Sequence, residues 1–315
     1  DDSCYEMGYK NEDRDGKICV IFNFKKFNRG DAENKNQERK GTDIDRNSIR
    51  TLFGEKLGFR VQVYEDRTRE EMVQVLRTLA TTNRPTTYCF CLFVLSHGKD
   101  DAIHCSDGNT IELADVYAEF YPEKCTSLIG KPKLFFVEAC RGNETDTGVQ
   151  CDSSSRADPS SFKRTLPKHA DLFVFYSTCP GRYAYRDEKT GSYFIQSLCE
   201  VIEINYHREH FLDMMTSVNN RVAGKEIPSG SLQTVKQMSI FHCALRKKIW
   251  FADQGTLYPK PCHGQLQNPV NLTPLEPGET GQASSSRLAR STRRFRDGAL
   301  HLCRACRQWS KCARS

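Results

Sequence analysis

Cys140 and His97 are the two residues whose chemistry stands out in this chain. Each follows a short apolar run: His97 comes just after residues 89–95, and Cys140 just after residues 134–137. A thiol becomes an effective nucleophile when a neighbouring base takes its proton, and histidine is the usual base. The separation of 43 positions allows the two side chains to lie at the ends of adjacent strands. The spacing therefore predicts nucleophilic chemistry by a cysteine–histidine pair.

Glycine follows each of these two residues closely, at Gly98 and Gly142. Glycine is the residue of choice where the backbone turns sharply or comes close to a substrate. In open α/β sheets, ligands bind beyond the carboxyl ends of the strands. A single cysteine at a strand end is more often a packed thiol than a nucleophile. The prediction of a site therefore depends on the two residues and their glycines taken together.

The elements that must position this pair alternate along the chain. Apolar, strand-like runs occupy residues 18–24, 60–64, 89–95, 134–137, 171–176 and 239–245. Apolar residues at helical spacing lie between them, in residues 44–57, 72–80, 113–120, 194–202 and 211–222. Thr68 and Glu71 form a plausible capping box at the start of the second helix. Continuous apolar strands that alternate with amphipathic helices predict an α/β fold with a mainly parallel sheet covered on both faces.

The residues around Cys140 make a specific resemblance. The run Glu-Ala-Cys-Arg-Gly at 138–142 differs by one residue from the Gln-Ala-Cys-Arg-Gly signature of caspases, in which a histidine lies about 50 residues upstream. Four other segments are also similar to caspase segments, in the family's order: residues 39–43, 95–98, 130–135 and 191–198. The chain resembles the caspase family over about residues 17–251, and most of all the executioner group. The resemblance implies a caspase-like, six-stranded, mostly parallel sheet with helices on both faces.

The resemblance also implies a reaction, cleavage of proteins after aspartate, in apoptotic proteolysis. Cys140 would attack the scissile carbonyl, and His97 would handle the proton given to the leaving amine. The backbone N–H groups of Gly98 and Cys140 would stabilise the oxyanion, each at about 3 kcal/mol. No metal or organic cofactor is implied.

The implied substrate pocket is basic. Arg39 and Arg186 match the two arginines that hold the substrate aspartate, and a guanidinium fork pairs bidentately with a carboxylate. This basic pocket argues against a related peptidase that cuts after lysine or arginine. The aromatic positions that line the neighbouring subsites are matched by Tyr183, Tyr185 and Tyr193.

Glu138 is the clear departure from the family pattern, which has a neutral glutamine at this position. A carboxylate in the pocket would compete with the substrate carboxylate for the two arginines. Three outcomes are open: Glu138 pairs with one arginine, it takes up a proton and donates a hydrogen bond as glutamine does, or it is displaced from the pocket. The first two predict that Glu138→Gln raises activity on aspartate substrates.

The chain divides by composition and by resemblance into five parts. We expect a flexible leader at 1–16, a large catalytic subunit at 17–143, a cleavable linker at 144–165, a small catalytic subunit at 166–252 and a disordered basic tail at 253–315. Within the linker, Asp152 and then Asp146 are the candidate processing sites. Processed subunit pairs would form a homodimer through the last strand, residues 239–245.

Charge and cysteine usage bear on partners and location. The net charge of +6 comes from residues 287–315, which hold nine Lys and Arg and one acid, so the rest of the chain is slightly acidic. A nucleic-acid-binding fold would carry its charge on the folded domain. The apolar runs are too short to span a membrane. The 15 cysteines are scattered and odd in number, which favours a reducing, cytoplasmic setting over a disulfide scaffold.

Two rival interpretations remain. The tail holds residues of the types that bind zinc, although no apolar core surrounds them: His301, Cys303, Cys306 and Cys312. A zinc or nucleic-acid module is therefore one alternative. The other is an inactive homologue that only binds caspase partners, against which the intact Cys140 and His97 argue.

Overall fold

Six strands form one sheet at the centre of the protein, in the order β13-β8-β7-β3-β1-β2. The structure is a computed structural model, which describes residues 3–8, 16–28, 38–142, 167–229 and 233–253. All neighbouring strands run parallel except β13, which is antiparallel to β8. The six-stranded, mostly parallel sheet is therefore confirmed. The strands are β1 (Lys17–Asn23), β2 (Arg60–Glu65), β3 (Cys89–Leu95), β7 (Lys133–Glu138), β8 (Leu172–Tyr176) and β13 (Ile240–Cys243).

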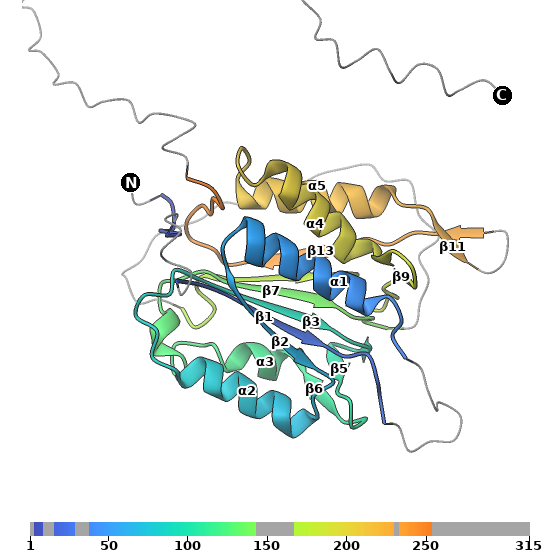
Figure 1. The fold of residues 1–315 in the computed structure, drawn as a ribbon, viewed down its shortest axis with the longest axis horizontal. Helices are drawn as coiled ribbons and strands as arrows, with labels where there is room; N and C mark the ends of the chain where they lie inside the picture. Colours follow the sequence, from blue (N-terminus) through green and yellow to red (C-terminus); the bar gives the residue numbers. More distant parts are fainter. Residues whose placement is uncertain (1–2, 9–15, 29–37, 143–166, 230–232, 254–315) are drawn as a thin grey trace, which may run out of the picture. The chain divides into compact units, whose positions relative to one another are not determined.

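Helices cover both faces of this sheet, as the sequence predicted. Figure 1 shows α1, α4 and α5 on one face and α2 and α3 on the other. Thr68 starts α2 with the expected capping box, since its side chain accepts from the Glu71 N–H and the Glu71 side chain accepts from the Thr68 N–H. The helices are α1 (Thr42–Ile49), the π-helix η2 (Arg50–Lys56), α2 (Arg69–Thr81), α3 (Leu113–Ala118), the 3₁₀ turn η3 (Thr126–Leu128), α4 (Tyr193–Asn205) and α5 (Phe211–Gly224).

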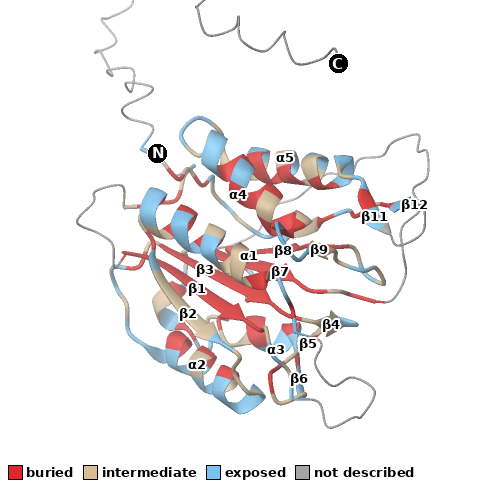
Figure 2. Ribbon diagram, turned by 45° about the vertical axis from the view of Figure 1, so that its right-hand side comes forward, coloured by how far each residue is buried: buried red, intermediate tan, exposed pale blue. Residues whose placement is uncertain are grey.

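The core consists of two apolar layers, one on each face of the sheet. Every residue of β1, β3, β7 and β8 is buried, which Figure 2 shows as continuous red strands. Successive side chains of a strand point to opposite faces. In β1, Cys19 and Ile21 pack in the layer that α1, α4 and α5 cover, while Ile18 and Val20 pack in the layer under α2 and α3. This two-sided burial explains why the strands are apolar runs and not alternating ones.

Short elements at the carboxyl end of the sheet were not predicted. They are β4 (Gly98–Lys99), β5 (Ala102–His104) and β6 (Thr110–Glu112) in one small sheet, β9 (Arg186–Asp187) with β10 (Gly191–Ser192), and β11 (Ile227–Ser229) with β12 (Gln233–Val235). Strands of two or three residues are too short to show a period of two in the sequence. The helix predicted over 44–57 is also divided, because α1 passes into the π-helix η2 at Arg50.

The amino-terminal segment differs from the flexible leader predicted for residues 1–16. Within it, residues 3–8 lie against the body, with Tyr5 5% and Met7 1% exposed. Cys4 forms a parallel bridge with Lys248, and the Tyr5 N–H donates to the Lys248 carbonyl at 2.9 Å. Two apolar residues make too short a pattern for a sequence-based prediction, so only the tertiary contacts reveal this docking.

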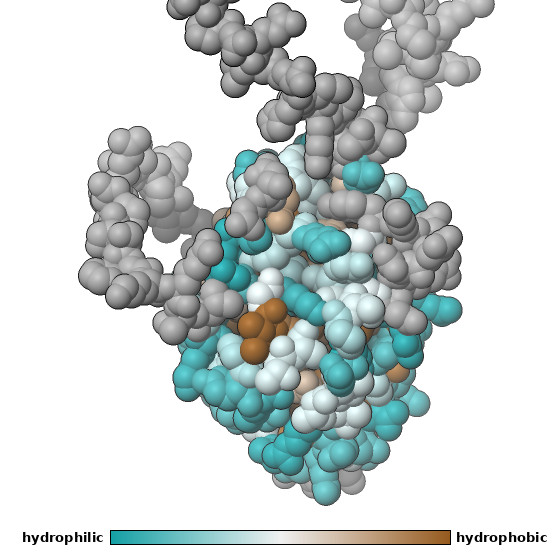
Figure 3. Space-filling view, turned by 90° about the vertical axis from the view of Figure 1, so that its left-hand side faces the viewer, coloured by the Kyte–Doolittle hydropathy of each residue, from teal (hydrophilic) through white to brown (hydrophobic). Residues whose placement is uncertain are grey.

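Figure 3 shows a small hydrophobic patch with hydrophilic side chains around it on one face of the protein. Among the described residues, the large hydrophobic side chains classed as exposed are Ile129, Tyr183, Ile204 and Met238. No helix in the described parts of the chain is long and apolar enough to cross a membrane.

Candidate active site

His97 and Cys140 lie at equivalent positions beyond two neighbouring strands. β3 and β7 are parallel and hydrogen-bonded, and their last residues, Leu95 and Glu138, face each other in the register. Each of the two reactive residues comes two positions later. Gly98 brings the segments into contact, because a methyl group placed on it would lie 2.8 Å from the Cys140 carbonyl oxygen. A side chain at position 98 would therefore push the histidine and cysteine segments apart.

The Cys140 thiol lies against the loop that follows β8. Its Sγ is 3.4 Å from the Ala184 N–H nitrogen and 3.6 Å from the Ala184 carbonyl oxygen. Burial raises the pKa of the Cys140 thiol, and the Ala184 N–H is the largest of the effects that oppose this rise. The thiol is therefore protonated near neutral pH, and attack on a carbonyl requires a base to remove its proton.

A close backbone contact holds that loop beside Cys140. The Arg141 N–H donates to the Arg182 carbonyl at 3.0 Å, and the Gly181 N–H donates to the Arg141 carbonyl at 2.8 Å. A methyl group on Gly142 would lie 2.3 Å from the backbone of Gly181. Glycine at 142 is thus required by the approach of the two segments, as the sequence suggested.

The three predicted subsite tyrosines lie together in this loop and at the start of α4. The rings of Tyr183 and Tyr185 are 6.3 Å apart between centroids, and Tyr183 is 37% exposed. The Tyr193 N–H donates to the Tyr185 carbonyl at 3.3 Å. The side-chain amide of Gln237 bonds to this loop at two points. Its Oε1 accepts from the Tyr185 N–H and its Nε2 donates to the Ser177 carbonyl, both at 2.8 Å.

Arg39 and Arg186 come together from distant parts of the chain. Arg39 is 1% exposed, and its Nη1 donates to the Phe24 carbonyl at 3.0 Å and to Thr42 Oγ1 at 2.9 Å. The Arg186 Nε donates to the Lys40 carbonyl at 2.8 Å, directly beside Arg39. Burial and the neighbouring Arg186 charge lower the pKa of Arg39 to about 9. Two cations this close are stabilised by a nearby anion, and Asp45 acts on Arg39 in this sense.

Glu138 lies in the same cluster and is not displaced from it. Its side chain is 1% exposed and forms no ion pair within 4.0 Å in the described part of the chain. Burial and the nearby Asp45 raise the pKa of Glu138 to about 8, against the opposing effects of Arg39, Arg186 and Ser177. Glu138 is therefore not displaced from the pocket, and its burial favours the neutral carboxyl group over the carboxylate.

Three residues around the site were missed by the sequence analysis: Asp45, Ser177 and Gln237. Asp45 is fully buried on the inner face of α1, where it precedes Ile49 by one helical turn. A carboxylate in an apolar helical stripe is a signal that sequence reasoning can use. Ser177 follows β8 and bonds the Ala139 backbone through its hydroxyl, at 3.3 Å to both N and O. Nothing in the local sequence distinguishes Ser177 or Gln237.

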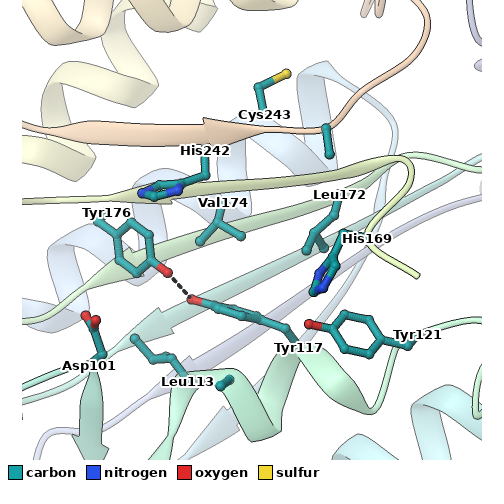
Figure 4. Close-up of a pocket in the computed structure, with 12 residues that line it drawn as sticks. Asp101, Leu113, Tyr117, Tyr121, His169, Leu172, Val174, Tyr176, His242 and Cys243 are labelled. Carbon is teal, nitrogen blue, oxygen red and sulfur yellow. Dashed lines mark hydrogen bonds between the residues drawn. The ribbon is translucent and has the colours of Figure 1, made fainter. Parts of the chain in front are cut away.

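A cavity of about 430 Å³ lies near this site but is separate from it. Figure 4 shows it between α3, β8 and β13, with Tyr117 and Tyr176 joined by a hydrogen bond of 3.3 Å. Its lining includes Asp101 and Tyr176 but neither Cys140 nor His97. Arg141 contacts both, since its Nε donates to the Asp101 carboxylate at 2.6 Å and its guanidinium lies 3.9 Å from the Tyr176 ring centre. The cavity therefore adjoins the residue after Cys140.

Several predicted sites lie outside the described residues. These are the processing candidates Asp146 and Asp152 and the tail residues considered for zinc, His301, Cys303, Cys306 and Cys312. Among the residues that the structure describes, no group of three or more His, Cys, Asp or Glu side chains is arranged to hold a metal ion.

Known proteins are similar to this chain over most of its length. The caspase domain family matches residues 16–250. Caspase-3 of Mesocricetus auratus is 36% identical over 254 residues, which cover 79% of this chain and 87% of that protein. Caspase-3 of Mus musculus is 35% identical over 256 residues, with the same coverage of 79% and 87%. Caspase-7 of Gallus gallus is 38% identical over 223 residues, 70% of this chain and 69% of that protein.

Proposed function

Because this chain belongs to the caspase family, we propose that Cys140 and His97 perform the family's reaction here, with Arg39 and Arg186 holding the substrate aspartate. The protein is a cysteine endopeptidase that cleaves proteins after aspartate, in apoptotic proteolysis. The observation that carries the residue assignment is the register of β3 and β7, because it sets His97 and Cys140 at the same level beyond neighbouring strands.

The proposed reaction proceeds in two steps. Cys140 Sγ attacks the backbone carbonyl carbon of the substrate aspartate while His97 takes the thiol proton, and His97 then gives that proton to the leaving amine of the next residue. A water molecule, deprotonated by His97, next attacks the thioester and releases the acid product and the free thiol. The N–H groups of Gly98 and Cys140 stabilise the oxyanion in both steps, at about 3 kcal/mol for each donor.

Selection for aspartate follows from the charge of the pocket. Arg39 is buried with its Nη1 already bonded to the protein, while its Nε has no hydrogen-bond partner in the described part of the chain. Arg186 lies beside it. A substrate carboxylate would satisfy the remaining donors, and its short side chain would place the scissile carbonyl near Cys140. Tyr183, Tyr185 and Tyr193 would line the subsites before the aspartate.

Activation and assembly follow the family's pattern in this proposal. Cleavage in the linker 144–165, at Asp152 and secondarily at Asp146, would separate a large subunit (17–143) from a small one (166–252). β13 ends the six-stranded sheet, and its outer edge would pair with the same strand of a second copy to form the dimer. We place this enzyme in the cytoplasm, since buried free thiols such as Cys19 and Cys91 suit a reducing compartment.

The test of this proposal is cleavage of peptides by the purified protein. Cys140→Ala should abolish cleavage after aspartate while the fold remains, because the change removes the attacking sulfur and little else. His97→Ala should cost about as much, since groups that act as a unit are strongly non-additive. Cys4→Ala, at a free cysteine outside both the site and β13, is the matched control and should retain activity. Titration of the active site would separate this enzyme from an inactive homologue, which would show no reactive thiol.

A further inference from the structure

Two polar atoms in the aspartate pocket are buried without a hydrogen-bond partner in the described part of the chain: Arg39 Nε and Glu138 Oε2. Both side chains are 1% exposed, and each lies close enough to the other to affect its ionisation. A buried polar atom left unpaired is costly, so such atoms mark places where a ligand completes the bonding. One of these atoms is a donor and the other belongs to a carboxyl group, so a carboxylate ligand satisfies both only if Glu138 carries a proton.

The neighbouring acid cannot take that role, because its oxygens are already in use. Asp45 accepts hydrogen bonds from the Ser192 N–H at 2.9 Å and from Gln196 Nε2 at 2.7 Å. These bonds fix α1 against the start of α4. Asp45 also adds negative charge beside Glu138, which makes a second carboxylate there unfavourable.

Charged and polar groups from several elements act on Glu138. Arg39 lies before α1, Asp45 is within α1, Arg186 is in β9, Ser177 follows β8 and the Cys140 thiol lies two residues along. Two cations and one anion thus surround Glu138 before substrate binds. A substrate aspartate brings a second anion, so the pocket is balanced when Glu138 is neutral and holds one excess negative charge when Glu138 is ionised.

We propose that Glu138 is a specificity-determining acid that binds the substrate aspartate in its protonated form, donating its carboxyl O–H to the substrate carboxylate. This inference rests on the proposed function, in which Arg39 and Arg186 grip the same carboxylate. Aspartate recognition by this enzyme therefore requires a proton held on Glu138. Loss of that proton places two carboxylates side by side in a buried pocket.

The pH dependence follows from the sign of the shift. The pKa of Glu138 lies at about 8, well above the usual range for glutamate, because of burial and Asp45. Glu138 is neutral at pH 7 and ionised at pH 9. The value of kcat/KM reports groups of the free enzyme, so cleavage after aspartate should lose about 10-fold for each pH unit above this pKa. Peptides with asparagine in place of aspartate carry no such charge and escape this loss.

The experiment compares matched aspartate and asparagine peptides between pH 6 and pH 9.5. The ratio of the two kcat/KM values cancels the titration of Cys140 and His97, which both substrates share. In the parent the ratio should fall by about 10-fold between pH 7 and pH 9. In Glu138→Gln it should stay constant within about 2-fold, and Glu55→Gln, an exposed control on η2, should behave as the parent. A ratio that stays constant in the parent, or falls equally in Glu138→Gln, would overturn the proposal.

A second measurement needs no turnover, so it separates failure of this inference from failure of the proposed function. An acid whose folded pKa is raised stabilises the fold at low pH, and this stability is lost as the pH rises through the folded value. Between about pH 5 and pH 8 the parent should lose roughly 3 °C of melting temperature per pH unit relative to Glu138→Gln. If the melting temperatures of the parent and Glu138→Gln change with pH in the same way, Glu138 does not hold the proposed proton, and this result stands even for an inactive enzyme. If the two melting temperatures diverge as expected but the protein cleaves no peptide, only the proposed function is rejected.

Discussion

Tyr5→Phe should destabilise this protein, although Tyr5 lies in a segment whose sequence predicts a flexible leader. The Tyr5 hydroxyl donates to Asp171 Oδ1 at 2.6 Å and accepts from the Arg246 N–H at 2.9 Å. Asp171 is 1% exposed and receives two further bonds from the Arg246 guanidinium, at 2.8 and 2.9 Å. Removal of one oxygen atom therefore leaves a buried carboxylate with one donor fewer and a backbone N–H without its acceptor.

The size of the effect follows from these partners. A hydrogen bond to a charged group contributes about 1.5–3 kcal/mol, and an unsatisfied buried group costs a similar amount. Because the Arg246 guanidinium still pairs with Asp171 in the variant, we expect the lower part of this range, about 2 kcal/mol. For a domain of this size, each kcal/mol shifts the melting temperature by roughly 2–4 °C. The expected loss is therefore about 4–8 °C.

Thermal unfolding of the full chain, followed by circular dichroism, measures this shift. Tyr64→Phe is the matched control, because the Tyr64 hydroxyl makes one bond of 3.3 Å to Gln62 and its ring stacks on Phe22. That variant should melt within about 2 °C of the parent, as is usual for changes at partly exposed positions. Equal melting temperatures for the parent and Tyr5→Phe would refute the reasoning and show that residues 3–8 are not held against the body.

Three further predictions concern the site and its flanking segments. Gly142→Ala should lower kcat/KM by about 100-fold, because the added methyl collides with the Gly181 backbone and displaces the loop beside the thiol, whereas Gly224→Ala, with open space around it, should not. Mass spectrometry of the processed enzyme should show a chain that ends at Asp152. Removal of residues 258–315 should change peptidase activity and melting temperature very little, since this sequence has no periodic apolar face, and a loss of many degrees would show that it packs on the body.

Most of the fold was open to sequence-based prediction because its signals are local. The run at 89–95 is a strand with those same bounds, β3, since seven consecutive apolar residues suit a strand buried on both faces. The capping box at Thr68 fixes the start of α2 by bonds between residues three positions apart. The small sheets around the site were missed for the opposite reason, because two-residue strands such as β9 form only when the segments around them are already in place.

The proposed catalytic pair and the pocket arginines were predicted from short runs of sequence and the order in which they occur. The ionisation state of the pocket could not be predicted in this way, because it depends on distances between residues that are far apart in the chain. Asp45 and Arg186 act on the pKa of Glu138 only after α1, β7 and β9 meet at the end of the sheet. The sequence by itself determined which groups this enzyme has available. Only the tertiary structure places Glu138 in a buried position beside Asp45. Burial and neighbouring charge set the pKa of a carboxyl group, and neither can be read from the order of residues in the chain.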